Sequence, residues 1–167
     1  MIVTIGGFMG TGKSTVGKEL AIRMGWPFFD LDDLVEQACV EHHSLTISGL
    51  IAASREHDFR ATESEVATRW IGTASQPCIL ALGGGSLHNE SLGSFIETHS
   101  TLFVLNAPWN WVEERIMSSD RPLKRDAHVL FELRKSGYNR GTPVNVNCRS
   151  ISSIVDELES LVRSHEC

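Results

Sequence analysis

Short apolar runs alternate along the chain with longer stretches in which apolar residues recur at helical spacing. This alternation is typical of a parallel β-sheet whose faces are covered by helices. Each run is rich in β-branched or aromatic residues and is bounded by turn-forming residues, so it predicts a strand. The predicted strands are Ile2 to Gly6, Pro27 to Asp30, Cys78 to Leu82, Thr101 to Asn106 and Val144 to Asn147.

The longer stretches between the runs predict helices. Ser150 can begin the last of them as an N-cap, because its hydroxyl can accept a hydrogen bond from a backbone N–H group of the first turn. The predicted helices are Lys13 to Met24, Asp33 to Val40, Arg55 to Trp70, Asn89 to His99, Pro108 to Met117 and Ser150 to Arg163. Because the 167 residues contain no repeat, low-complexity tract or linker, we expect a single α/β domain over residues 1–167.

Composition narrows the classes of protein to consider. The formal net charge is -6 and the basic residues are dispersed, so we expect no binding to nucleic acid. No apolar run is long enough to span a membrane, and Met1 to Gly6 is too short for a signal peptide. The four cysteines form no C-x-x-C pair and indicate reduced thiols in a cytoplasmic protein; they are Cys39, Cys78, Cys148 and Cys167.

The strongest chemical signal lies where the first predicted strand meets the first helix. The residues there are Gly7-Phe8-Met9-Gly10-Thr11-Gly12-Lys13-Ser14, which match the G-x-x-x-x-G-K-[ST] pattern of a phosphate-binding P-loop. In such a loop the backbone N–H groups face the β-phosphate, the lysine bridges β- and γ-oxygens, and the serine hydroxyl binds Mg²⁺. A turn that only joined a strand to a helix would not require Lys13 and Ser14. We therefore expect Mg²⁺ as cofactor and ATP as co-substrate, bound by Gly10, Thr11, Gly12, Lys13, Ser14 and Thr15.

Carboxylates follow the second predicted strand, in the sequence Asp30-Leu31-Asp32-Asp33. Asp30 and Asp32 are two residues apart, so both can project toward the sheet edge at which α/β folds bind ligands. We expect Asp30 to hold Mg²⁺ through water, beside Ser14. Asp32 is placed to accept the proton of a substrate hydroxyl as it attacks. The alternative is that Asp32 or Asp33 only caps the next helix.

Six features taken together resemble the shikimate kinase family. They are the P-loop, Asp30-Leu31-Asp32, Asp58-Phe59-Arg60, Leu82-Gly83-Gly84-Gly85, Asp120-Arg121-Pro122-Leu123 and Arg134-Lys135-Ser136-Gly137-Tyr138, which follow one another over nearly the whole chain. The resemblance implies a three-layer P-loop fold with strand order 2-3-1-4-5 and a short lid at about residues 118–130. It also implies a monomeric enzyme that transfers the ATP γ-phosphoryl group to the 3-hydroxyl of shikimate, a cyclic carboxylate, in aromatic amino-acid biosynthesis.

The resemblance assigns roles to residues around the acceptor substrate. Arg60 and Arg134 would hold the substrate carboxylate, since a planar guanidinium can bind two oxygens at once. Asp32 would hold ring hydroxyls in addition to its catalytic role. The substrate would be covered by the glycine triplet Gly83, Gly84 and Gly85. Two alternatives stay open from the residues alone: Arg60 could be a solvated helix residue paired with Glu56 or Glu63, and the glycines could be a flexible connection.

On the nucleotide side, the resemblance makes Arg121 a catalytic lid arginine over the phosphates, and a solvated loop arginine is the alternative. Arg115 and Arg149 would lie beside the adenine. The sequence departs from the family pattern here, because the stretch from Arg121 to Arg134 is short and no proline precedes Tyr138.

Three other functions compete with this interpretation. A kinase for a sugar acid such as gluconate could share the loop and the sheet, but the arginine pair and the glycine triplet favour shikimate. A nucleoside monophosphate kinase is disfavoured because no base-recognition segment is present. A non-catalytic relative that only binds nucleotide would not need Lys13, Asp32 and Arg121 together.

Overall fold

Within residues 1–117 and 126–165, which this computed structural model describes, the centre of the molecule is a five-stranded parallel β-sheet. Its strands are β1 (Ile2–Gly7), β2 (Phe28–Asp30), β3 (Cys78–Ala81), β4 (Thr101–Asn106) and β5 (Thr142–Asn145). Their order is β2-β3-β1-β4-β5, which confirms the predicted order. Because the strands are parallel, their carboxyl ends meet at one edge, where α/β sheets bind ligands.

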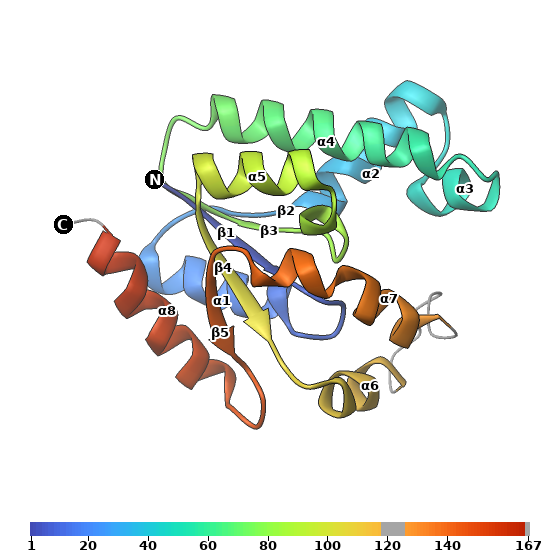
Figure 1. The fold of residues 1–167 in the computed structure, drawn as a ribbon. Coiled ribbons are helices and arrows are strands. Elements are labelled where there is room, and N and C mark those ends of the chain that lie inside the picture. Colours follow the sequence, from blue (N-terminus) through green and yellow to red (C-terminus); the bar gives the residue numbers. More distant parts are fainter. Residues whose placement is uncertain (118–125, 166–167) are drawn as a thin grey trace.

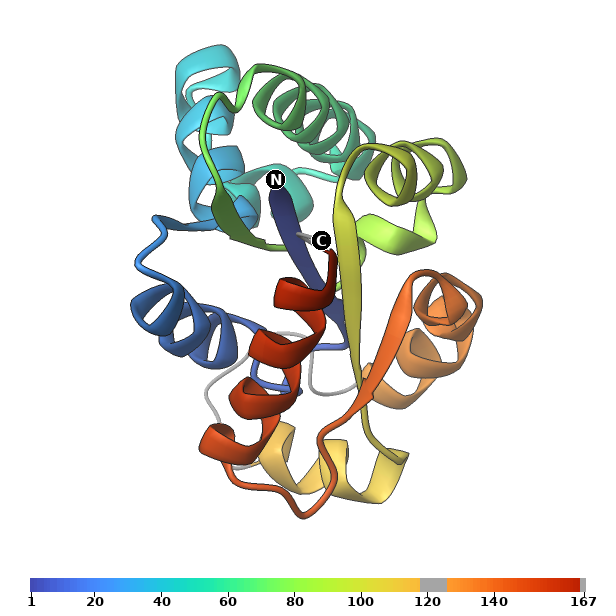
Figure 2. The ribbon, with the colours of Figure 1, turned by 90° about the vertical axis from the view of Figure 1, so that its left-hand side faces the viewer.

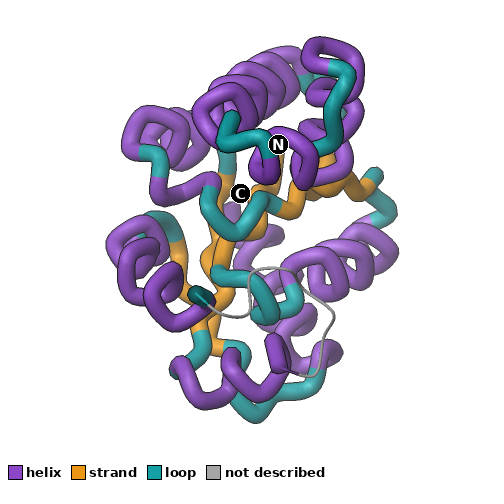
Figure 3. Tube along the Cα trace, turned by 90° about the vertical axis from the view of Figure 1, so that its right-hand side faces the viewer, coloured by secondary structure: helices purple, strands orange, loops and turns teal. Residues whose placement is uncertain are grey.

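Helices cover both faces of the sheet, giving the three layers that were predicted (Figure 1). α1 (Lys13–Met24) and α8 (Ile151–His165) pack on one face, and α8 crosses in front of the strands in Figure 2. The other face is covered by α2 (Leu31–His43), α4 (Glu56–Thr73) and α5 (Glu90–His99). Figure 3 shows the strands between these two layers. The remaining elements are α3 (Ile47–Ala52), α6 (Trp109–Met117), α7 (Ala127–Arg134) and the 3-10 turns η1 (Ser86–His88) and η2 (Lys135–Asn139).

The core lies on both sides of the sheet. In β4, Phe103 and Leu105 pack into the cluster formed with α1 and α8, whereas Leu102 and Val104 pack into the cluster on the opposite face. All four side chains are buried, because successive residues of a strand point to opposite faces and both faces are covered. This two-sided burial explains why the strands appear in the sequence as continuous apolar runs.

Two elements begin two residues earlier than predicted. The last strand begins at Thr142 and not at Val144, with Pro143 opposite Val104 of β4. Proline is tolerated there because β5 is an edge strand, whose outer side needs no N–H donor. The second helix begins at Leu31 and not at Asp33, because the Asp30 carboxylate accepts a hydrogen bond from the Asp32 N–H and caps it. The alternative that Asp32 or Asp33 is the cap is therefore wrong.

Other helices follow the prediction closely, and Ser150 does cap α8, since its hydroxyl accepts a hydrogen bond from the Ser153 N–H. The short helices α3 and α7 were not predicted, because six or eight residues carry too little periodicity. Residues 127–130 of the predicted lid are the first turn of α7, and residues 118–125 lie outside the described residues. In the described part of the chain, no helix combines the length and apolar character needed to cross a membrane.

Candidate functional site

The glycine loop turns the end of β1 into the start of α1. Gly10 and Gly12 have φ angles of 85° and 93°, a left-handed conformation that residues with a Cβ atom rarely adopt. Gly12 is the N-cap of α1 and offers no side-chain acceptor to the helix. The N–H groups of the first turn and the positive end of the helix dipole can therefore serve an anion, which is the chemistry of phosphate binding.

The loop is held in shape by one carbonyl group. The oxygen of Phe8 accepts hydrogen bonds from the Thr11 N–H at 3.3 Å, the Thr11 hydroxyl at 2.8 Å and the Lys13 ammonium at 3.2 Å. These three hydrogen bonds to one carbonyl oxygen hold the loop in a defined conformation. The predicted ATP residues from Gly10 to Thr15 are thus brought together around one small cavity, apart from the buried Thr11.

The predicted metal residues are in direct contact. The Ser14 hydroxyl donates a hydrogen bond of 2.6 Å to the Asp30 carboxylate. A hydroxyl and a carboxylate are oxygen ligands of the kind that Mg²⁺ prefers, and Mg²⁺ commonly completes its shell with phosphate oxygens and water. Among the described residues, no cluster of three or more His, Cys, Asp or Glu side chains could hold a metal ion. The Ser14 hydroxyl and the Asp30 carboxylate therefore fit a Mg²⁺ ion whose other ligands are phosphate oxygens and water.

Asp32 lies in the same cavity, which has a volume of about 130 Å³ and is also lined by Lys13, Ser14, Asp30 and Leu82. The carboxylate is open to the cavity, yet the surrounding walls reduce its hydration. This loss of hydration raises the pKa of Asp32, the charge of Asp30 raises it further, and the Lys13 ammonium opposes both. A carboxylate that binds a proton more readily than usual is suited to act as a general base.

The glycine triplet follows β3 and lies against both predicted arginines. A methyl group built on Gly85 would approach both terminal nitrogens of Arg60 to 3.0 Å and the Arg134 Cζ atom to 3.3 Å. A methyl group built on Gly83 would lie 2.7 Å from an Asp32 oxygen. The triplet is therefore a closely packed wall between the arginine pair and the aspartate, and not only a flexible connection.

Arg134 is 9% exposed, and burial lowers the pKa of its guanidinium. The nearby charge of Arg60 lowers it as well, whereas Tyr138, Glu63 and Glu56 oppose the shift. Within the described part of the chain, no carboxylate forms an ion pair with Arg134. A buried cation beside a second cation is costly unless an anion pairs with it, so this geometry indicates a site for an anionic ligand.

Arg60 comes from α4 and is partly committed to that helix. It donates a hydrogen bond of 2.7 Å to Glu63 and lies 3.6 Å from Glu56, so the helix pairing considered from the sequence does occur. It occurs together with the approach to Gly85, not in place of it. The two interpretations of Arg60 are compatible.

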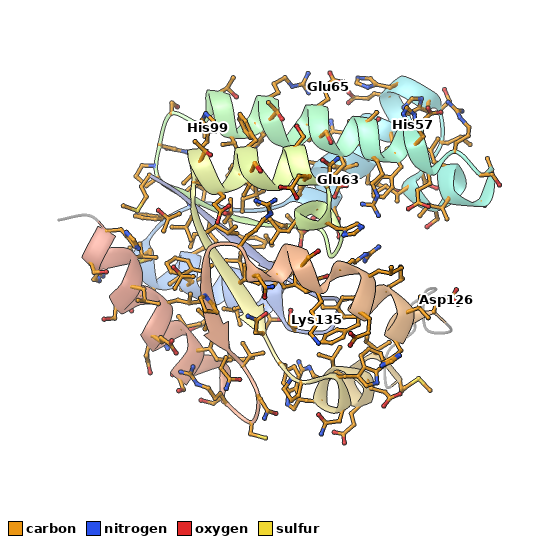
Figure 4. All side chains as sticks on the ribbon, viewed as in Figure 1. His57, Glu63, Glu65, His99, Asp126 and Lys135 are labelled. Carbon is orange, nitrogen blue, oxygen red and sulfur yellow. The ribbon has the colours of Figure 1, made fainter. Side chains whose placement is uncertain are left out.

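The sequence alone suggests Glu63 only as a surface partner of Arg60. Its side chain is 2% exposed and joins the Arg60 guanidinium to the Ser86 hydroxyl, which donates to it at 2.6 Å. Figure 4 shows Glu63 on the inner side of α4, whereas Glu65 points away from the molecule. The available signal was the three-residue spacing from Arg60, which places both residues on one helix face. Ser86 and Tyr138, both buried, also had no predicted role.

The remaining predicted nucleotide residues are placed as follows. The Arg115 Nε–H group donates to the Gly10 carbonyl at 2.9 Å, and its guanidinium lies 4.6 Å from the centre of the Trp111 ring. Arg149 donates to the Asn145 carbonyl, Ser153 and Glu157 in the segment that joins β5 to α8. The adenine contacts of Arg115 and Arg149 stay predictions. Arg121 lies outside the described residues.

A second and larger cavity, of about 330 Å³, lies at the ends of β4 and β5 between the loop and α7. Its lining includes Phe8, Leu105, Phe131 and Tyr138, and it shares no residue with the cavity that contains Lys13 and Asp32. The smaller cavity is lined by Lys13 of the glycine loop and by the carboxylates of Asp30 and Asp32. We therefore place the chemistry there.

Comparison with known proteins gives a consistent result. Residues 9–161 match the family model described as shikimate kinase. A shikimate kinase of Salinibacter ruber is 38% identical over 75% of this chain, although the match covers only 60% of that relative. A shikimate kinase of Lactococcus lactis is 33% identical over 95% of this chain and 96% of its own length. A solved structure of shikimate kinase from Acinetobacter baumannii in complex with shikimate superposes with a TM-score of 0.84, at 23% identity, over 98% of this chain and 93% of that one.

Proposed function

The chain belongs to the shikimate kinase family, and on this premise we propose that it transfers the γ-phosphoryl group of ATP to the 3-hydroxyl of shikimate. The products would be shikimate 3-phosphate and ADP. The family match identifies an ATP-dependent phosphotransferase that acts on an alcohol group. The acceptor itself is inferred from the site.

The observation that carries the proposal is the buried Arg134 beside Arg60, against Gly85. Two guanidinium groups that share one wall can bind a carboxylate through several charge-assisted hydrogen bonds. Gly83, at the other end of the triplet, places the same wall next to Asp32. A ligand that spans these groups needs a carboxylate at one end and a hydroxyl at the other, a requirement that shikimate meets.

The residues of the site supply what in-line phosphoryl transfer requires. The hydroxyl oxygen of the acceptor forms a bond to the γ-phosphorus, the bond from that phosphorus to the bridging oxygen breaks, and ADP leaves. Asp32 takes the proton of the attacking hydroxyl. Lys13 and the N–H groups of the loop stabilise the charge on the phosphate oxygens. Mg²⁺, which Ser14 and Asp30 would hold, neutralises further phosphate charge when it is bound.

The proposal is tested by an assay that couples ADP release to a change in absorbance. Shikimate, gluconate and nucleoside monophosphates are supplied in turn with MgATP. We expect rapid ADP release with shikimate only. Stimulation by gluconate alone would transfer the assignment to a sugar-acid kinase. Tight nucleotide binding without turnover of any acceptor would identify a non-catalytic relative.

Replacement of Arg60 by alanine is expected to weaken acceptor binding by about 2 kcal/mol, roughly 30-fold in KM for shikimate, because one buried guanidinium remains to hold the carboxylate. The KM for ATP should change little, since Arg60 lies on α4 and not in the loop. Steady-state kinetics with each substrate varied in turn measures both constants. An unchanged KM and kcat for shikimate would contradict the role of Arg60.

Replacement of Gly85 by alanine places a methyl group against both guanidinium groups and should raise KM for shikimate by roughly tenfold, since the arginines must move. Gly72→Ala is the matched control, because a methyl group at Gly72 in α4 meets no atom within 4 Å. Comparison of KM for shikimate in the two variants separates the effect of a methyl group beside the arginines from the effect of any glycine-to-alanine change. Equal KM values for both variants would show that the wall does not contact the acceptor.

We also propose, from the family resemblance and the composition, that the chain is a single P-loop kinase domain with a lid at about residues 118–130 that carries Arg121. We propose that it acts as a monomer in the cytoplasm on ATP and shikimate, without nucleic acid or membrane partners. The dispersed basic residues and the free thiols of Cys39 and Cys78 support this proposal. Sedimentation equilibrium of the purified protein measures the oligomeric state.

A further inference from the structure

A hydroxyl group of the turn η2 forms a hydrogen bond with the middle of the glycine triplet. The Tyr138 hydroxyl donates a hydrogen bond of 2.7 Å to the carbonyl oxygen of Gly84, the central residue of the triplet. Tyr138 is only 8% exposed, so this bond is shielded from water. Gly84 itself lies between the loop and Arg134, since a methyl group built on it would be 3.5 Å from Met9 N and 3.8 Å from Arg134 Nη1.

The approach of Tyr138 depends on the residue before it. A methyl group built on Gly137 would lie 2.6 Å from the carbonyl oxygen of Leu87 and 3.0 Å from the backbone nitrogen of His88. Both neighbours are backbone atoms of η1, which cannot move aside as a flexible side chain could. Glycine at position 137 thus lets η2 pack directly on the segment that follows the triplet, and this contact brings Tyr138 to Gly84.

The tyrosine also touches the nucleotide side of the site. Its ring lies edge-on to the ring of Phe8, with 6.1 Å between the centroids, and the Phe8 carbonyl is the acceptor that organises the loop. Burial raises the pKa of Tyr138, while the positive charge of Arg134 opposes this shift. The hydroxyl is therefore neutral at physiological pH and can donate its proton to Gly84.

We propose that Tyr138 is a positioning residue for the acceptor: its hydroxyl holds the Gly84 carbonyl so that Gly83 stays against Asp32 and Gly85 against the two arginines. Tyr138 touches neither substrate in this proposal. It sets the distance between the carboxylate-binding pair and the aspartate, which decides whether an acceptor hydroxyl reaches Asp32. The inference rests on the proposed function, because it assumes that an acceptor binds along the triplet.

Tyr138→Phe tests the proposal, since it removes one oxygen and keeps the ring contact with Phe8. The matched control is Thr4→Val, which removes a fully buried hydroxyl that lies 2.8 Å from Ser100 Oγ, at a position in β1 that does not line the cavity containing Asp32. Both variants lose a buried hydrogen bond and should melt at a lower temperature than the wild-type protein. Only Tyr138→Phe should raise KM for shikimate, by about tenfold, with KM for ATP within about twofold of the wild-type value.

Hydrogen exchange measured by mass spectrometry on the peptide that contains the triplet supplies a second readout, which needs no turnover. Exchange at residues 83–85 should be faster in Tyr138→Phe and unchanged in Thr4→Val. Equal KM values and equal exchange in Tyr138→Phe and the wild-type protein would overturn the proposal. An equal rise of KM in both variants would show that Tyr138 only stabilises the fold, and it would also overturn the proposal. Wild-type protein without shikimate turnover would reject the proposed function, and exchange at the triplet would then decide whether Tyr138 holds it.

Discussion

Lys13→Ala is expected to lower kcat by about 10³-fold or more while the protein stays folded. The Lys13 ammonium lies at the phosphate cavity and already donates to the Phe8 carbonyl. In the proposed mechanism Lys13 bridges the β- and γ-oxygens, where negative charge shifts as the phosphoryl group moves. No other lysine lines that cavity among the described residues, so the charge would not be replaced. Single-turnover kinetics with saturating MgATP measures the loss in the chemical step.

Lys18→Ala is the matched control for Lys13. Lys18 lies in the same helix, but its ammonium is exposed and faces the Phe28 ring at 5.7 Å. The control should keep nearly the wild-type rate, and both variants should show wild-type circular dichroism. Turnover by Lys13→Ala within about tenfold of the control would contradict the assignment of Lys13 to the transferred phosphoryl group.

The sequence was sufficient for the parts of the site that are local. The loop from Gly7 to Ser14 and the Asp30-Leu31-Asp32 segment each lie at a strand end, and the carboxyl ends of parallel strands meet at one edge. Parallel pairing of β1 with β3 and of β3 with β2 therefore brings the two segments together without further information. The contact of Ser14 with Asp30 at 2.6 Å is the direct result.

The sequence was insufficient where a role depends on what a side chain packs against. Glu63 and Glu65 look alike in the chain, yet one is buried between Arg60 and Ser86 and the other is exposed. Which face of α4 turns toward the glycine triplet is decided by the packing of α4 against α2 and α5. The contact of Tyr138 with Gly84 joins residues 54 positions apart and has no pattern of its own.

Asp32→Asn is expected to lower kcat by about 10² to 10⁴-fold, because an amide cannot accept the proton of the attacking hydroxyl. Asp33→Asn is the matched control, since Asp33 is the next residue in the first turn of α2, is exposed, and loses the same charge. In the wild-type protein, kcat/KM should fall as the pH is lowered through the raised pKa of Asp32. This acidic limb should therefore lie above the usual range of an aspartate, and it should be absent from the residual activity of Asp32→Asn.

The raised pKa of Asp32 also predicts that the folded protein becomes less stable as the pH rises, whereas kcat/KM increases. Because the pKa of Asp32 is higher in the folded protein, the folded state binds more protons than the unfolded state between the two pKa values. The free energy of unfolding therefore falls as the pH rises through this window, and it stays lower above it. Asp32→Asn should remove that loss, so the inactive variant should melt at a slightly higher temperature than the wild-type protein at pH 7. The effect is small because the carboxylate is open to the cavity.

Thermal melts of the wild-type protein, Asp32→Asn and Asp33→Asn across pH 3 to 8 measure this difference. The gain of Asp32→Asn over Asp33→Asn should vanish below about pH 3.9, where the aspartate is protonated in both states. If Asp32→Asn were fully active and no more stable than the wild-type protein, Asp32 would be neither the base nor a destabilising charge. Loss of activity together with a gain in stability is expected of a carboxylate that is held for catalysis at the expense of the fold.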